Sequence, residues 1–63
     1  MITMENAPPL HQNVICCVND GENVYFMIGK RVHIDVPDSF IYYSPEHGEE
    51  YPLEDVEHWH KLP

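Results

Sequence analysis

The sequence predicts a small, mainly β domain built on a three- to four-stranded antiparallel sheet. Short runs of β-branched and aromatic residues alternate with clusters of Gly, Pro, Asn and Asp, a pattern typical of strands joined by turns. We expect residues 7–63 to form one domain and residues 1–6 to be a flexible N-terminus. The pair Pro8-Pro9 favours an extended entry into the domain. With 63 residues the core must be small, so self-association, a metal or a partner could add to stability.

The strongest local signal is a β-hairpin at residues 19–22. In NVICCVNDGENVYFMI, two apolar runs flank the tetrapeptide NDGE. Asn19, Asp20 and Gly21 tolerate the left-handed backbone that a tight hairpin requires. The pattern therefore predicts strands at about 13–19 and 23–28.

Two more strands are expected after the hairpin. Gly29-Lys30 suggests a second tight turn, followed by a strand at about 31–36 in which apolar and polar residues alternate. Such alternation implies a sheet with one solvated face. After the breaker PDS, residues 40–43 (FIYY) are predicted to form a fourth short strand. Residues 44–52 (SPEHGEEYP) have the composition of a loop.

The last ten residues fit two structures equally well. In a helix starting near Pro52, Val56, Trp59 and Leu62 fall at i+3 spacing, which would make the domain α+β. In a strand, Val56 and Leu62 share one face and Trp59 points to the other. In both cases we expect Trp59, Val56 and Leu62 to be structural, with Trp59 contributing much of a small core.

The ending DVEHWHKLP, together with APP and NVICCV near the start, resembles a family of short domains of unknown function from tailed phages and prophages. Members open with a proline-containing segment and a strand, and close on a Val-Thr-His-Trp-Met-Pro-Leu-Pro-like ending. Glu57, His60 and Lys61 depart from that close, and the residues that match it are Asp55, Val56, His58, Trp59, Leu62 and Pro63. A family that carries proline in this segment implies an extended C-terminal strand. The resemblance also implies an accessory phage or prophage protein that acts on something belonging to the host.

The charge balance argues against several function classes. Eleven Asp and Glu oppose three Lys and Arg, for a formal net charge of −8. Direct binding of nucleic acid, which needs clustered Lys and Arg, and binding to an anionic membrane are therefore not expected. No apolar run has the length of a membrane span, and the first residues lack the pattern of a signal peptide. We expect the protein in the cytoplasm of a host cell, with adjacent Cys16 and Cys17 as reduced thiols.

The acidic residues near the C-terminus are the leading candidate site. Alternate residues on a strand are about 6.6 Å apart, comparable to the spacing of successive phosphates. A ridge of this kind could occupy a basic surface on a host protein and so inhibit or modulate it, as a nucleic-acid mimic would. The simpler interpretation is a solvated face that keeps a small protein soluble. The predicted contact residues are the carboxylates Glu46, Glu49, Glu50, Glu54, Asp55 and Glu57 with the tyrosines Tyr42 and Tyr43.

A metal site and an enzyme are the other classes considered. On a strand, His58 and His60 would project from one face, and His47 or a cysteine could complete a zinc site, although no known zinc spacing is present. We therefore take metal binding as the alternative and expect no cofactor. The sequence contains no catalytic triad, phosphate loop or nucleotide fingerprint, so it does not indicate an enzyme. Self-association through exposed strand edges is a third hypothesis.

Overall fold

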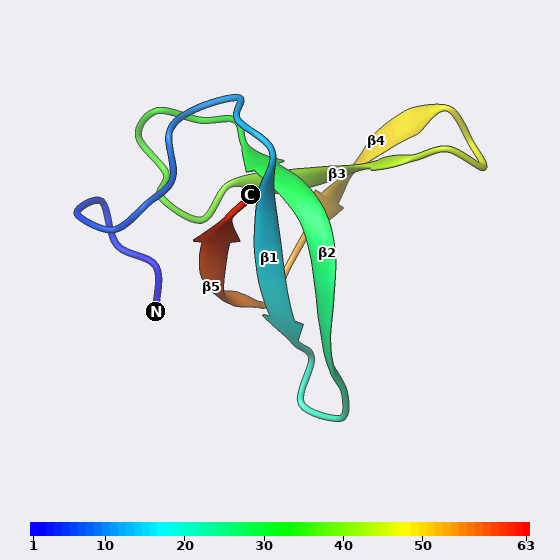
Figure 1. Cartoon of the computed structure of the whole chain (residues 1–63), viewed down its shortest axis with the longest axis horizontal. Helices are drawn as coiled ribbons and strands as arrows, with labels where there is room; N and C mark the ends of the chain where they lie inside the picture. Colours follow the sequence, from blue (N-terminus) through cyan, green and yellow to red (C-terminus); the bar gives the residue numbers. More distant parts are fainter.

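Five antiparallel strands make up the domain in a computed structural model that describes residues 1–63, and the structure contains no helix (Figure 1). The strands lie side by side in the order β4-β3-β2-β1-β5. The first four form a meander, and β5 returns to pair with β1. The mainly β class is confirmed, with five strands in place of the three or four predicted. The strands are β1 (Val14–Asn19), β2 (Val24–Arg31), β3 (Phe40–Ser44), β4 (Glu49–Leu53) and β5 (Val56–Lys61).

The predicted hairpin at residues 19–22 is confirmed as the connection between β1 and β2. The Asp20 carboxylate accepts hydrogen bonds from the backbone amides of Glu22 at 2.9 Å and Asn23 at 2.8 Å. The side-chain oxygen of Asn19 accepts one from the amide of Gly21 at 3.0 Å. Gly21 has a φ of 94°, which a glycine adopts without strain. Local side-chain chemistry therefore specifies this turn.

The predicted turn at Gly29-Lys30 and the strand at about 31–36 are wrong. β2 continues through both residues to Arg31, and residues 32–39 form a loop. Gly29 serves close packing here, because a Cβ atom would lie 3.0 Å from both the Cys16 Sγ and the Ile41 backbone oxygen. The alternation at 31–36 failed as a strand signal because Arg31 draws the loop back on itself. Its guanidinium donates hydrogen bonds to the backbone oxygens of Ile34 and Val36.

The short strand predicted at 40–43 is confirmed as β3, but residues 44–52 do not form only a loop. Their second half belongs to β4, which pairs with β3 along its whole length. The turn between the two strands covers residues 45–48 and ends on Gly48, with a φ of 66°. Pro52 lacks an amide donor, yet it is tolerated because β4 is at the edge of the sheet.

The core lies on one face of the bent sheet. β2 pairs with β1 from Val24 to Gly29 and with β3 only at Lys30 and Arg31, so the β3–β4 hairpin turns away from β1 and β2 (Figure 1). Cys16 points into the core and its neighbour Cys17 to the opposite face, as alternation on β1 requires, and both are free thiols. Burial raises the pKa of the Cys16 thiol to about 11. The core consists of Ile2, Val14, Cys16, Val18, Phe40 and Leu53.

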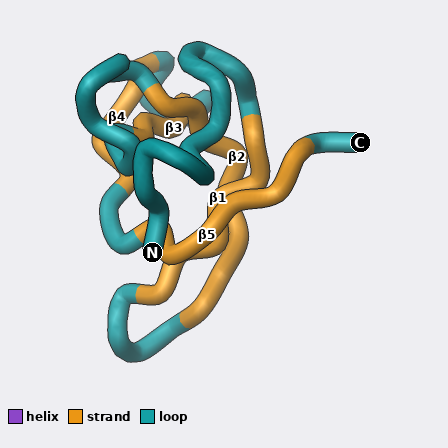
Figure 2. Tube along the Cα trace, turned by 90° about the vertical axis from the view of Figure 1, so that its left-hand side faces the viewer, coloured by secondary structure: helices purple, strands orange, loops and turns teal.

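Both ends of the chain pack against this core. Ile2, within the segment expected to be a flexible N-terminus, is only 7% exposed. Figure 2 shows the N-terminus next to β5. The C-terminal segment is a strand, as the family resemblance implied, and Trp59 and Val56 on it pack half-buried against the core. Leu62 follows β5 and is also half-buried. No helix in the structure has the length and apolar character needed to cross a membrane.

Candidate partner-binding site

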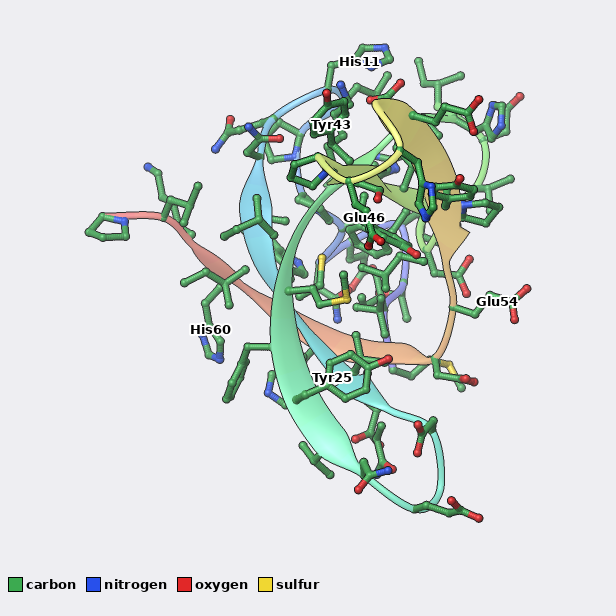
Figure 3. All side chains as sticks on the ribbon, turned by 90° about the vertical axis from the view of Figure 1, so that its right-hand side faces the viewer. His11, Tyr25, Tyr43, Glu46, Glu54 and His60 are labelled. Atoms are coloured by element: carbon green, nitrogen blue, oxygen red, sulfur yellow. The ribbon has the colours of Figure 1, made fainter.

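A groove opens where the β3–β4 hairpin turns away from β2. One wall carries Tyr25 and Met27 of β2, and the opposite wall comes from β3, β4 and the turn that follows β4. Figure 3 views the molecule from this side and shows Tyr25 on β2 and Glu54 beyond the end of β4. We call this feature the tyrosine groove, and its lining residues are Tyr25, Met27, Tyr42, Tyr51, Pro52, Leu53, Glu54 and Asp55.

Strand pairing brings two tyrosines together in this groove. Tyr42 on β3 lies directly opposite Tyr51 on β4, and their ring centroids are 5.9 Å apart. The Tyr51 hydroxyl donates a hydrogen bond to the Glu49 carboxylate at 3.1 Å, which raises the pKa of Tyr51. His47, in the β3–β4 turn, meets the Tyr51 ring edge-on at 6.0 Å. Aromatic faces next to carboxylates form a surface suited to Lys and Arg side chains.

The six predicted carboxylates are all exposed, but they do not form one ridge. Only Glu54 and Asp55, in the turn between β4 and β5, lie in the tyrosine groove. Glu50 points to the other face of β4, and Glu57 lies on β5 beside the N-terminal residues. Glu46 is in the β3–β4 turn, and Glu49 begins β4. Only two of the six predicted carboxylates, Glu54 and Asp55, therefore line the groove.

The predicted tyrosines separate in the same way. Tyr42 lines the groove, whereas Tyr43 points to the opposite face and is 59% exposed. Sequence reasoning did not single out Tyr25, Met27 or Tyr51 for this site. The loop predicted for residues 44–52 contains no strand on which Tyr51 could face Tyr42.

The acidic side chains are almost unneutralised within the domain. One salt bridge is present, between the Lys30 Nζ and the Glu50 carboxylate at 3.0 Å. Ten of the eleven Asp and Glu residues therefore have no salt-bridge partner. Arg31 is buried and donates hydrogen bonds to backbone oxygens and to the Met4 sulfur, so its charge does not pair with a carboxylate. A surface left so negative attracts cationic groups from outside the molecule.

The histidines named for a metal site do not come together. His58 and His60 are neighbours on β5 with ring centroids 5.3 Å apart, while His47 contacts Tyr51 in the β3–β4 region. No group of three or more His, Cys, Asp and Glu side chains is arranged to hold a metal ion. The structure therefore supplies a pair of imidazoles without a third ligand.

Comparison with known proteins finds no family model, curated protein or solved structure that matches the chain. The resemblance of the C-terminal ending to the phage domain family stays a prediction.

Proposed function

We propose that this protein is a small binding module that captures a basic segment of another protein in the tyrosine groove. The observation that carries the proposal is the placement of Glu54 and Asp55 beside three tyrosines in one groove of an otherwise unneutralised acidic surface. Lys and Arg side chains combine an apolar stem with a cationic end. The stems can pack on Tyr42 and Tyr51 while the cationic ends face the two carboxylates.

Binding of this kind acts in two stages. The negative field of the domain attracts a basic partner and raises the rate of encounter. The groove then selects an extended segment, because its aromatic wall can bury side-chain stems at little cost in conformational entropy. A partner whose basic site is occupied in this way is inhibited by steric and electrostatic occlusion.

The setting that we propose for this activity is the cytoplasm of a bacterial host. The similarity of the ending to phage and prophage domains supports a viral accessory protein, and the charge supports a host target with a basic surface. The role is binding without catalysis or cofactor. Occupation of a site that normally holds nucleic acid is the version of this proposal that the net charge of −8 favours.

A pair of charge-matched variants tests the groove. The double variant Glu54→Gln/Asp55→Asn removes two negative charges from the rim, and asparagine tolerates the positive φ of 62° at position 55. The control, Glu5→Gln/Asp38→Asn, removes the same charge from exposed positions that do not line the groove. Binding of a fluorescent Lys- and Arg-containing peptide is measured by anisotropy at low and high salt, beside capture from host lysate.

We expect the groove variant to weaken peptide binding by about tenfold, equivalent to about 1.4 kcal/mol, and the control to change it by much less. Binding by the wild-type protein should also decrease as salt rises, because exposed charges are screened. Equal losses of peptide affinity in both double variants would show that the peptide binds through nonspecific charge attraction and not in the groove. Binding that is insensitive to salt would contradict the electrostatic mechanism.

A further inference from the structure

Strand β5 carries a pair of histidines on one face. His58 and His60 flank Trp59, which packs against the core, so the two imidazoles project to the opposite face of the strand. Figure 3 shows His60 projecting outward from β5. Pairing with β1 fixes this segment, since His58 lies opposite Cys17 and His60 opposite Ile15. The two imidazoles are therefore held next to each other by a strand that is itself part of the sheet.

The separation of the two rings matches that of imidazoles bound to one metal ion. Zn–N bonds are about 2.0 to 2.1 Å long, so two imidazoles bound at a tetrahedral angle have ring centroids about 5 Å apart. The ring centroids of His58 and His60 are 5.3 Å apart, and the ring planes are nearly perpendicular at 85°. Rotation about the side-chain bonds can therefore bring one nitrogen of each ring to a shared ion with little change in ring separation.

Both imidazoles are accessible and unoccupied by other contacts. The two side chains are exposed, and neither ring takes part in a hydrogen bond or a salt bridge within the domain. β5 is an edge strand, so no further strand covers its outer side. An ion can thus reach the pair from solvent without displacing an existing interaction.

The charges around the pair favour a cation. The chain has a net charge of −8, and its negative field raises the local concentration of cations. On β1, the residues that face the pair are Ile15 and Cys17, which bring no positive charge. Lys61, the one cationic residue of β5, alternates to the other face. Imidazole nitrogen selects Zn²⁺ among divalent ions, because Mg²⁺ and Ca²⁺ prefer oxygen ligands.

We propose that His58 and His60 bind one zinc ion, with water in the remaining coordination positions. No third His, Cys, Asp or Glu side chain is placed to join them. The site is therefore open, and its affinity should be in the micromolar range, weaker than that of a closed site with four protein ligands. Neither histidine lines the tyrosine groove, so the zinc site is independent of peptide capture.

Titration of the reduced wild-type protein with zinc chloride tests the site. The ring-proton NMR signals of His58 and His60 should shift or broaden together, and EDTA should reverse the change. The signals of the other three histidines, His11, His33 and His47, should change little and serve as internal controls. Calorimetry should give one zinc ion per chain. No change at millimolar zinc, or equal changes at all five histidines, would overturn the proposal.

Single substitutions test whether both rings bind the same ion. His58→Gln and His60→Gln should each raise the zinc dissociation constant by about tenfold or more, because each removes one of two protein ligands. The matched control is His33→Gln, which changes an exposed histidine in the loop after β2 and should leave zinc affinity unaltered. Circular dichroism establishes that each variant is folded. Undiminished binding in either His58→Gln or His60→Gln would contradict a shared ion.

Two further variants separate this site from its neighbours. Cys17→Ser should leave zinc affinity unchanged, since the thiol is buried and is not placed as a third ligand. A loss in this variant would show that sulfur binds the ion and would overturn the site of two imidazoles. Glu54→Gln/Asp55→Asn, which weakens peptide binding if the groove is the peptide site, should also leave zinc binding intact. Loss of zinc binding in that double variant would place the ion at the groove carboxylates instead.

Discussion

The indole Nε1 of Trp59 donates a hydrogen bond to the backbone oxygen of Asn6 at 2.6 Å. This contact fastens the last strand of the domain to a segment 53 residues earlier in the chain. This hydrogen bond lies beside Ile2, which is buried in the core. The N-terminal residues therefore cover the core on the side where the half-buried Trp59 packs against it. Trp59 therefore holds the two ends of the chain together as well as contributing apolar surface.

Replacing Trp59 with phenylalanine keeps most of the ring and removes the hydrogen-bond donor. We expect Trp59→Phe to lower the free energy of unfolding by about 1 kcal/mol from the lost bond, plus a smaller amount for the lost ring area. Trp59→Ala should cost at least about 2 kcal/mol, enough to unfold much of a domain this small. Urea titration followed by far-UV circular dichroism measures both changes.

Deletion of residues 1–6 provides the control for this contact. The deletion removes the Asn6 oxygen, so Trp59→Phe should cost less in the shortened chain than in the full one if the bond is the cause. Fully additive effects would show that Trp59 and the N-terminal segment stabilise the domain independently.

Arg31 is the second residue that connects distant segments. Its guanidinium is buried and donates hydrogen bonds to the backbone oxygens of Pro8 at 3.1 Å and Ile34 at 2.6 Å. Arg31→Met would leave these oxygens without a donor, and we expect a loss of about 2 to 3 kcal/mol in the free energy of unfolding. Arg31→Lys should recover only part of it, because an ammonium lacks the planar fork. Amide hydrogen exchange should increase in residues 32–39, and unchanged exchange there would contradict this role.

Gly29 is predicted to be intolerant of a side chain. The Cβ atom of Gly29→Ala would lie 3.0 Å from the Cys16 Sγ and 3.1 Å from the Leu53 Cδ2, so the core must shift. Overpacking of this kind costs about 1 to 3 kcal/mol. Cys16→Ala removes the sulfur, so Gly29→Ala should lower the free energy of unfolding by less in a Cys16→Ala background than in the wild-type chain. An equal loss in both backgrounds would point to the Ile41 backbone oxygen as the dominant clash.

Asp20 gives the hairpin a defined pH dependence. Hydrogen bonds from the Asn23 and Glu22 amides lower the pKa of this carboxyl below its ordinary value of 3.8. The folded state thus binds fewer protons than the unfolded state in this range, so the stabilisation is complete well above pH 3.8 and is lost as pH falls below it. Asp20→Asn cannot titrate, and its stability relative to the wild type should therefore improve as the pH decreases. A stability difference that stays constant through this range would falsify the assignment.

Much of the tyrosine groove could not be predicted from sequence. The run of carboxylates was visible, but only Glu54 and Asp55 share the groove with the tyrosines. Which carboxylates do so depends on the β3–β4 register and on the turn after β4. Tyr25 enters from β2 because the sheet splays after Lys30 and Arg31, and no local pattern encodes that divergence.

Features that depend only on neighbouring residues could be predicted from the sequence. The NDGE hairpin follows from side chains that bond their own turn, the short apolar runs indicate strands, and the excess of carboxylates sets the charge. Long-range contacts are the reason that β2 continues through Gly29, that Glu49–Leu53 forms a strand, and that the N-terminal segment packs against Trp59. In each of these cases the backbone groups or apolar surface are satisfied by partners distant in the chain. A local sequence pattern therefore shows the need for such partners without showing where they lie.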